Sequence, residues 1–200
     1  MEGGINLFAY VDGNVVNWVD PWGLARYVII VGDPGLGRHN VGQNFVRVAN
    51  TRAQELIGQG HTVDIVRASN ISQFNNAITI GSTIDGGVIY YGHGWTGVLY
   101  VGEMSEIGTD IDISNISRLS NRNLGASATI EINSCNAATG GRNSIAQQTA
   151  TQLQRITSGY NSPTGFTGTR GVYDYNRYPP STGPLYISPA PRGRMIPFNP

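Results

Sequence analysis

Short apolar runs alternate with helical segments along the middle of the chain, and this alternation constrains the fold more than any other feature. The apolar runs lie at residues 26–32, 61–67, 87–91 and 128–132. Apolar side chains recur at helical spacing at residues 43–57, 71–78 and 145–156. Strand–helix alternation is typical of a parallel sheet with helices on both faces. The sequence therefore predicts an α/β fold with a mostly parallel sheet flanked by helices.

The composition excludes several kinds of chemistry. Of the 200 residues, 13 are basic and 13 are acidic, so the formal net charge is zero, and every basic residue is Arg. Without Lys the chain has no P-loop lysine, Schiff base or Ser-Lys dyad. Without a net charge it has no global basic field that attracts nucleic acid, so no nucleic-acid partner is expected. One Cys excludes an intrachain disulfide and a CxxC zinc site. The longest strongly apolar run, residues 27–31, is far too short to span a bilayer.

We divide the chain into three parts. Residues 1–24 alternate short apolar pairs with turn residues and are too few to form a core. Residues 25–176 hold the strand–helix alternation. Residues 177–200 form a Pro-rich tail, because seven of the ten prolines lie between 179 and 200. This composition favours an extended segment, and the sequence leaves open whether the tail packs on the domain.

The first part carries a specific motif. The stretches GINLFAYV at residues 4–11 and VDPWGL at residues 19–24, with Asn14 and Asn17 between them, resemble the end of the core of RHS-repeat proteins. In that family the motif closes a large repeat shell. An aspartyl protease in the core cuts the shell directly after the leucine, and a variable C-terminal toxin follows.

The resemblance implies a cleavage junction between Leu24 and Ala25 in a piece of a longer protein. It also implies that the following domain is a toxin, secreted or delivered into a target cell by a secretion apparatus. The partners that it implies are an enclosing RHS shell and a cognate immunity protein.

Two strand ends carry the residues with candidate catalytic chemistry. His93 and Gly94 follow the apolar run 87–91, and Cys135, the sole Cys, follows the run 128–132. The carboxyl ends of parallel strands meet at one edge of a sheet, where adjacent strands lie about 4.8 Å apart. A thiol attacks as the thiolate, and an imidazole supplies the base or the cationic partner. We therefore predict a Cys135–His93 dyad, with the amides of Gly94 and Cys135 as the oxyanion hole.

The same two blocks resemble the caspase-like cysteine peptidases, the superfamily of caspases, metacaspases, gingipains, legumains, separases and bacterial CHAT domains. VIYYGHG at residues 88–94 and TIEINSC at residues 129–135 match the blocks that end in His-Gly and in Cys. The layout agrees from residue 26 to about residue 160, and the identity only in these two blocks. The resemblance implies a caspase-like fold, His93 as general base, Cys135 as nucleophile and Gly94 as oxyanion donor, with no cofactor. Ser134 departs from the pattern, because several members carry alanine, glycine or glutamine there.

Four of the 13 acidic residues lie between the two blocks, namely Glu103, Glu106, Asp110 and Asp112. They form either a solvated loop, a specificity wall that attracts a basic side chain of the substrate, or a calcium site, since hard cations take carboxylate oxygens. His39 lies in the glycine-rich stretch 32–39, where it is either a structural loop residue or part of the rim of the cleft. His61 is expected at the surface.

Together these features predict a toxin that acts as a cysteine endopeptidase on proteins of a target cell, with neither a metal nor an organic cofactor. An ADP-ribosylating or NAD-consuming toxin is an alternative, but such enzymes usually carry an E-x-E or Q-x-E pair, and two residues separate Glu103 from Glu106. A deaminase would need H-x-E with P-C-x-x-C, which the chain lacks. A non-catalytic binding module is the third alternative, and no basic amphipathic stretch favours membrane insertion.

Overall fold

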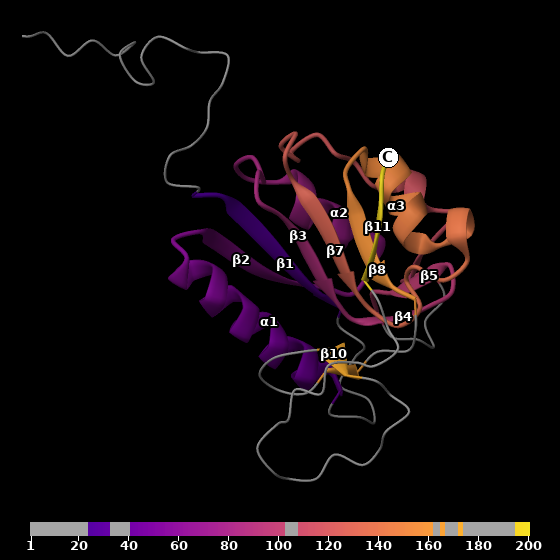
Figure 1. Ribbon diagram of the computed structural model, residues 1–200, viewed down its shortest axis with the longest axis horizontal. Coiled ribbons are helices and arrows are strands. Elements are labelled where there is room, and N and C mark those ends of the chain that lie inside the picture. The colour runs from indigo at the N-terminus through magenta and orange to yellow at the C-terminus, as the bar shows by residue number, and fades with distance from the viewer. Residues whose placement is uncertain (1–23, 33–40, 103–107, 162–164, 167–171, 174–194) are drawn as a thin grey trace, which may run out of the picture.

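The protein is described by a computed structural model, which covers residues 24–32, 41–102, 108–161, 165–166, 172–173 and 195–200. The strands of its main sheet are β1 (Arg26–Gly32), β2 (Thr62–Ala68), β3 (Gly87–Tyr91), β7 (Thr129–Asn133), β8 (Thr157–Tyr160) and β11 (Met195–Phe198). They lie in the order β11-β8-β7-β3-β1-β2 (Figure 1). All neighbours are parallel except β8 and β11. The prediction of a mostly parallel α/β sheet is confirmed, and the arrangement is consistent with a caspase-like α/β fold.

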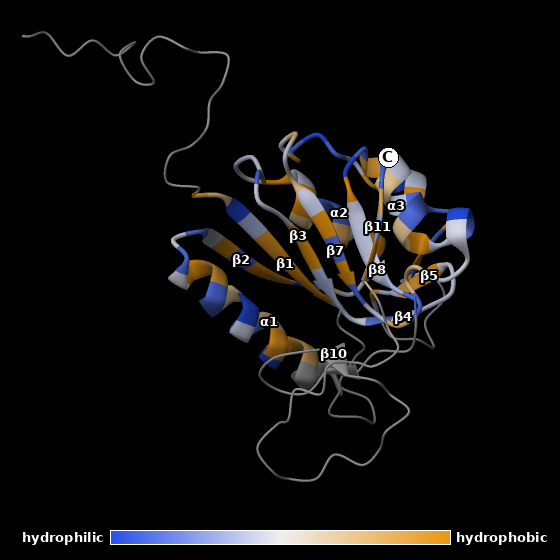
Figure 2. Ribbon diagram, viewed as in Figure 1, coloured by the Kyte–Doolittle hydropathy of each residue, from blue (hydrophilic) through white to orange (hydrophobic). Residues whose placement is uncertain are grey.

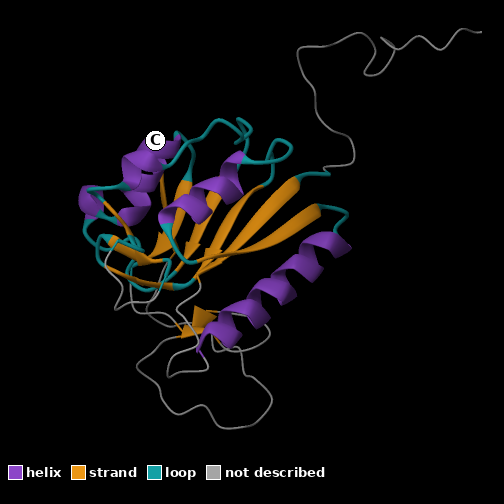
Figure 3. Ribbon diagram, turned by 180° about the vertical axis from the view of Figure 1, so that it is seen from behind, coloured by secondary structure: helices purple, strands orange, loops and turns teal. Residues whose placement is uncertain are grey.

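Helices cover both faces of this sheet. Figure 3 shows α1 (Val41–Gly58) on one face and α2 (Ile71–Thr79) and α3 (Ile145–Leu153) on the other. One apolar cluster joins Phe45 and Leu56 of α1 to Ile29 of β1, and a second joins Phe74 of α2 to Val28 of β1. Because it is covered on both sides, β1 is a nearly continuous apolar run rather than an alternating one (Figure 2).

The predicted elements differ from the observed ones mainly at their ends. The strands predicted at 26–32 and 87–91 have the observed bounds, whereas β2 and β7 each begin one residue later than predicted. The third helix ends at Leu153 rather than at residue 156, because Gln154 adopts a left-handed conformation with φ of 52°. The helix α2 begins after Asn70, whose side chain accepts a hydrogen bond from the Gln73 amide at 2.9 Å.

Short elements that the sequence analysis did not predict complete the fold. A three-stranded antiparallel sheet consists of β4 (His93–Trp95), β5 (Val98–Tyr100) and β6 (Ile111–Asp112). The strands β9 (Gly165–Phe166) and β10 (Val172–Tyr173) form a pair, and η1 (Ile116–Arg118) and η2 (Gly141–Asn143) are short 3₁₀ helices.

The end of the predicted Pro-rich tail belongs to the main sheet. Residues 195–198 form β11, which pairs with β8, so at least this part of the tail packs on the domain. Residues 174–194 lie outside the described residues. So do residues 1–23 with their motif.

Tyr90 ties the main sheet to the small one. It is completely buried in β3, and its hydroxyl donates a hydrogen bond to the carbonyl oxygen of Tyr100 in β5 at 2.9 Å. Burial raises the pKa of Tyr90 above its ordinary value, and the charge of Asp110 raises it further. The hydroxyl therefore stays protonated and keeps donating, so that it holds the small sheet against the end of β3.

Tyr90→Phe is expected to destabilise the fold by about 1–2 kcal/mol, because it leaves the Tyr100 carbonyl without its buried donor. Chemical denaturation measures the free energy of unfolding. The matched control is Tyr27→Phe, since the half-buried Tyr27 hydroxyl makes no hydrogen bond among the described residues, and this change is expected to cost almost nothing. Equal losses in the two variants would contradict the role of the Tyr90 hydroxyl.

Candidate active site

The parallel register of β3 and β7 brings the two predicted catalytic residues to matching positions. The last paired residues of these neighbouring strands are Tyr91 and Asn133. His93 and Cys135 each lie two residues beyond that pair. The Gly92 amide still donates to the Asn133 carbonyl oxygen at 3.4 Å, so the two chains remain side by side past the strand ends. The register therefore places His93 and Cys135 at the same carboxyl edge of the sheet, on neighbouring chains.

Gly94 lies directly against the segment that carries the thiol. A Cβ atom at Gly94 would lie 2.5 Å from Ser134 Oγ, 2.9 Å from Ser134 Cβ and 3.1 Å from the Cys135 carbonyl oxygen. Contacts this short leave no room for any side chain. Glycine at this position is therefore what allows the His93 strand to approach Cys135.

His93 is half-buried in an apolar environment. Phe45 of α1 packs against its imidazole, with the ring centroids 5.0 Å apart and the planes at 81°. Burial lowers the pKa of His93 below its ordinary value, because the charged form loses hydration. The imidazole is therefore neutral over a wider pH range, which is the form that accepts a proton. The sequence analysis did not single out Phe45. The one feature of the sequence that could have indicated it is that Phe45 is the first large apolar residue of the helix.

Cys135 is the more accessible of two adjacent nucleophilic residues. Its side chain is half-buried, whereas Ser134 is completely buried. After Cys135 the chain turns at Asn136, which adopts a φ of 55°, a conformation that Asn tolerates better than most residues. The Asn136 carbonyl oxygen accepts a hydrogen bond from the Thr139 amide at 3.0 Å. This turn leads the chain away and leaves the thiol at the edge of the sheet.

Ser134→Ala is expected to leave the protein as stable as before or to stabilise it by up to about 1 kcal/mol. The buried Ser134 hydroxyl has no hydrogen-bond partner among the described residues, so the substitution removes an unsatisfied polar atom. Thermal or chemical denaturation measures the change. A loss of more than about 1 kcal/mol would mean that the hydroxyl makes a hydrogen bond worth that much.

The structure describes only part of the predicted acidic loop. Glu103 and Glu106 lie outside the described residues. Asp112 of β6 accepts hydrogen bonds from the amide and the hydroxyl of Ser114 at 2.8 and 2.6 Å. Asp110 is half-buried, and burial raises its pKa. In the described part of the chain, no group of three His, Cys, Asp or Glu side chains is arranged to hold a metal ion.

The other two histidines and the predicted cleavage junction are not among the residues that the structure places at the edge that holds His93 and Cys135. His39 falls outside the described residues. His61 precedes β2, accepts a hydrogen bond from the Ala25 amide at 3.1 Å and packs on the Tyr27 ring, so it has a structural role. Leu24, at the start of the described chain, is 53% exposed.

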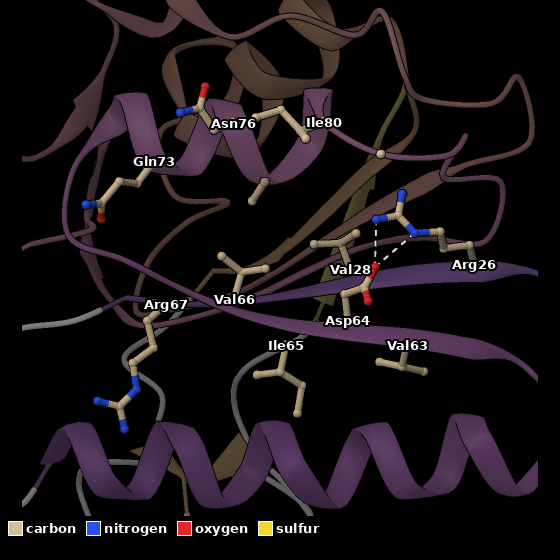
Figure 4. A pocket seen from close by; sticks show the side chains of 12 residues that line it. Arg26, Val28, Val63, Asp64, Ile65, Val66, Arg67, Gln73, Asn76 and Ile80 are labelled. Atoms are coloured by element: carbon tan, nitrogen blue, oxygen red, sulfur yellow. Dashed lines mark hydrogen bonds and ion pairs between the residues drawn. The ribbon is translucent and has the colours of Figure 1, made fainter.

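A cavity of about 670 Å³ lies at the opposite side of the sheet, between the edge strand β2 and α2 (Figure 4). The Arg26–Asp64 ion pair, at 2.6 Å, lies at one end of it. Charged side chains on an edge strand are a common protection against unwanted strand pairing. Because β1 separates β2 from β3, this cavity is distinct from the edge that holds His93 and Cys135.

None of the described helices has the length and apolar character that crossing a bilayer requires. Comparison with known proteins assigns no family: no protein-family model matches the chain, and no curated protein matches it in sequence.

Proposed function

We propose that the chain carries a caspase-like cysteine endopeptidase, with Cys135 as the nucleophile and His93 as the general base. The observation that carries this proposal is the matching position of the two residues beyond the paired ends of β3 and β7. The approach of Gly94 to Ser134 and Cys135 supports it, because it leaves the thiol and the imidazole on segments in direct contact.

The geometry suits general-base chemistry. Because burial lowers the pKa of His93, the imidazole is neutral over a wider pH range and is available as a proton acceptor. His93 takes the thiol proton as the sulfur attacks the peptide carbonyl carbon, and then gives this proton to the departing amine. The resulting thioester is cleaved by water, whose proton passes through His93 back to the sulfur. No metal or organic cofactor enters these steps.

The amides of Gly94 and Cys135 are the proposed oxyanion donors. Residues 96 and 97 form a two-residue loop between Trp95 and Val98, and these two flanking residues pair with each other. In such a hairpin, hydrogen-bonded and non-hydrogen-bonded pairs alternate. The Gly94–Leu99 pair is then of the second kind, so the Gly94 amide is expected to face away from β5 and to be available to a developing oxyanion.

The biological setting of the proposal comes from the motif before Leu24. Its resemblance to the end of an RHS core favours a toxin that is secreted or delivered into a target cell and cleaves proteins there. An RHS shell and an immunity protein are the proposed partners. The acidic residues between the two blocks, Asp110 and Asp112 among them, favour substrates with a basic side chain next to the cut.

The single thiol makes the test direct. The purified chain is divided in two, one half is alkylated with iodoacetamide at Cys135, and both halves are incubated with a proteome-derived peptide library. New peptide termini are expected only with the untreated half. Cleavage by both halves would remove Cys135 from the mechanism. Absence of cleavage by either half would contradict the peptidase assignment.

A further inference from the structure

We infer that Phe45 is a positioning residue for the His93 base: its ring holds the imidazole beside Cys135 and keeps water from one side of it. This inference rests on the proposed function, because it assigns a role within the same site. It concerns a residue to which the proposed chemistry assigns no step.

The fold explains why Phe45 reaches His93. The helix α1 follows β1 and runs back along the sheet, so its first turns lie near the carboxyl ends of the strands (Figure 1). Farther along α1, Ala49, Ala53 and Leu56 are buried against the same face of the sheet. This packing fixes the helix, and with it the phenyl ring at the helix end nearest His93.

The contact between Phe45 and His93 restricts the orientation of the imidazole. The two rings meet nearly perpendicular, at 81°, with centroids 5.0 Å apart, which is a favoured arrangement of aromatic pairs. Phe45 is only 3% exposed, so its ring is itself held on all sides. An imidazole packed against a fixed ring has fewer orientations available than one in open solvent, which favours the orientation needed for proton transfer.

The contact also explains the protonation of the base. Burial is the cause of the lowered pKa of His93, and Phe45 supplies part of that burial. Among the described residues, the titratable and charged groups on α1, β3, β5 and β6 are Arg47, Arg52, Glu55, Tyr90, Tyr91, Tyr100 and Asp112, and Cys135 follows β7. Arg52 and Glu55 form an ion pair with each other, and Arg47 is exposed.

The test measures the pKa of His93 itself. Proton NMR resolves the titration of the three histidines, and the His93 signal is identified by its loss in His93→Ala. Phe45→Ala is expected to raise the pKa of His93 toward its ordinary value, because water reaches the imidazole. The acid limb of the pH profile of peptide cleavage is expected to move upward with it. Phe45→Leu, which retains most of the side-chain volume, is the variant to use if the alanine variant does not fold, and a smaller upward shift is expected from it.

Phe74→Ala is the matched control. Phe74 is equally buried, at 3%, and also lies on a helix, but it packs on the other face of the sheet against Tyr90. Phe74→Ala should lower the free energy of unfolding about as much as Phe45→Ala does, and it should leave the pKa of His93 unchanged. An unchanged His93 pKa in both folded Phe45 variants, or an equal shift in Phe74→Ala, would overturn the inference. A shift confined to the Phe45 variants, in a chain that cleaves no peptide, would instead support this role and contradict the peptidase function.

Discussion

Cys135→Ala is expected to reduce peptide cleavage to the background rate, and His93→Ala to reduce it by a factor of about 10²–10⁴. The thiol forms the covalent intermediate, so its removal ends the proposed route. The imidazole only assists proton transfer, so some activity should survive its loss. The difference between the two variants is therefore as informative as the losses themselves.

Two measurements separate this effect from unfolding. Circular dichroism and denaturation report whether each variant retains the fold, and the rate of iodoacetamide labelling of Cys135 reports the reactivity of the thiol without any substrate. His93→Ala should slow labelling near neutral pH. His61→Ala is the control, because His61 lies by β2 and bonds to Ala25, so it should leave both rates unchanged. A His93→Ala chain that labels and cleaves like the unchanged protein would contradict the dyad.

The parts of the fold that the sequence predicts best are those buried on both faces. The strands β1 and β3 are uninterrupted apolar runs because helices cover them on either side, and their bounds agree with the prediction. The prediction of the dyad has the same origin. Once two buried strands are recognised as neighbours in a parallel sheet, the residues that follow them must share an edge.

The elements that the sequence analysis missed depend on contacts between distant segments. The strand β8, with sequence TSGY, has no apolar run, and β11 lies in a Pro-rich segment, so neither has a local signal. Each is held by backbone pairing with a neighbouring strand of the main sheet. The Phe45–His93 contact also joins residues far apart in the chain, and only the path of α1 along the sheet brings them together.

Gly94→Ala is expected to destabilise the protein by about 2 kcal/mol or more and to lower peptide cleavage by a factor of about 10² or more. The new methyl group would lie 2.5 Å from Ser134 Oγ and 2.9 Å from Ser134 Cβ, closer than real Cβ atoms approach. The two segments would have to move apart, which would carry His93 away from Cys135. A displacement of about 1 Å at a reacting group is enough to cost a factor of about 10² in rate.

The matched control is Gly58→Ala at the end of α1, where an added Cβ meets nothing within 4 Å. It should be neutral or stabilise the protein by up to about 1 kcal/mol, because Ala is the better helix former. Both variants are compared by denaturation and by the rate of peptide cleavage.

A second substitution tests the cause of the loss in Gly94→Ala. Adding Ser134→Gly removes the two nearest atoms, after which the nearest atom is the Cys135 carbonyl oxygen, 3.1 Å from the new methyl group. The double variant should therefore recover part of both the stability and the activity, beyond the sum of the two single effects, because the substituted residues are in contact. Additive losses would mean that the methyl group acts elsewhere, and the close approach of Gly94 to Ser134 would then not be what holds His93 beside the thiol.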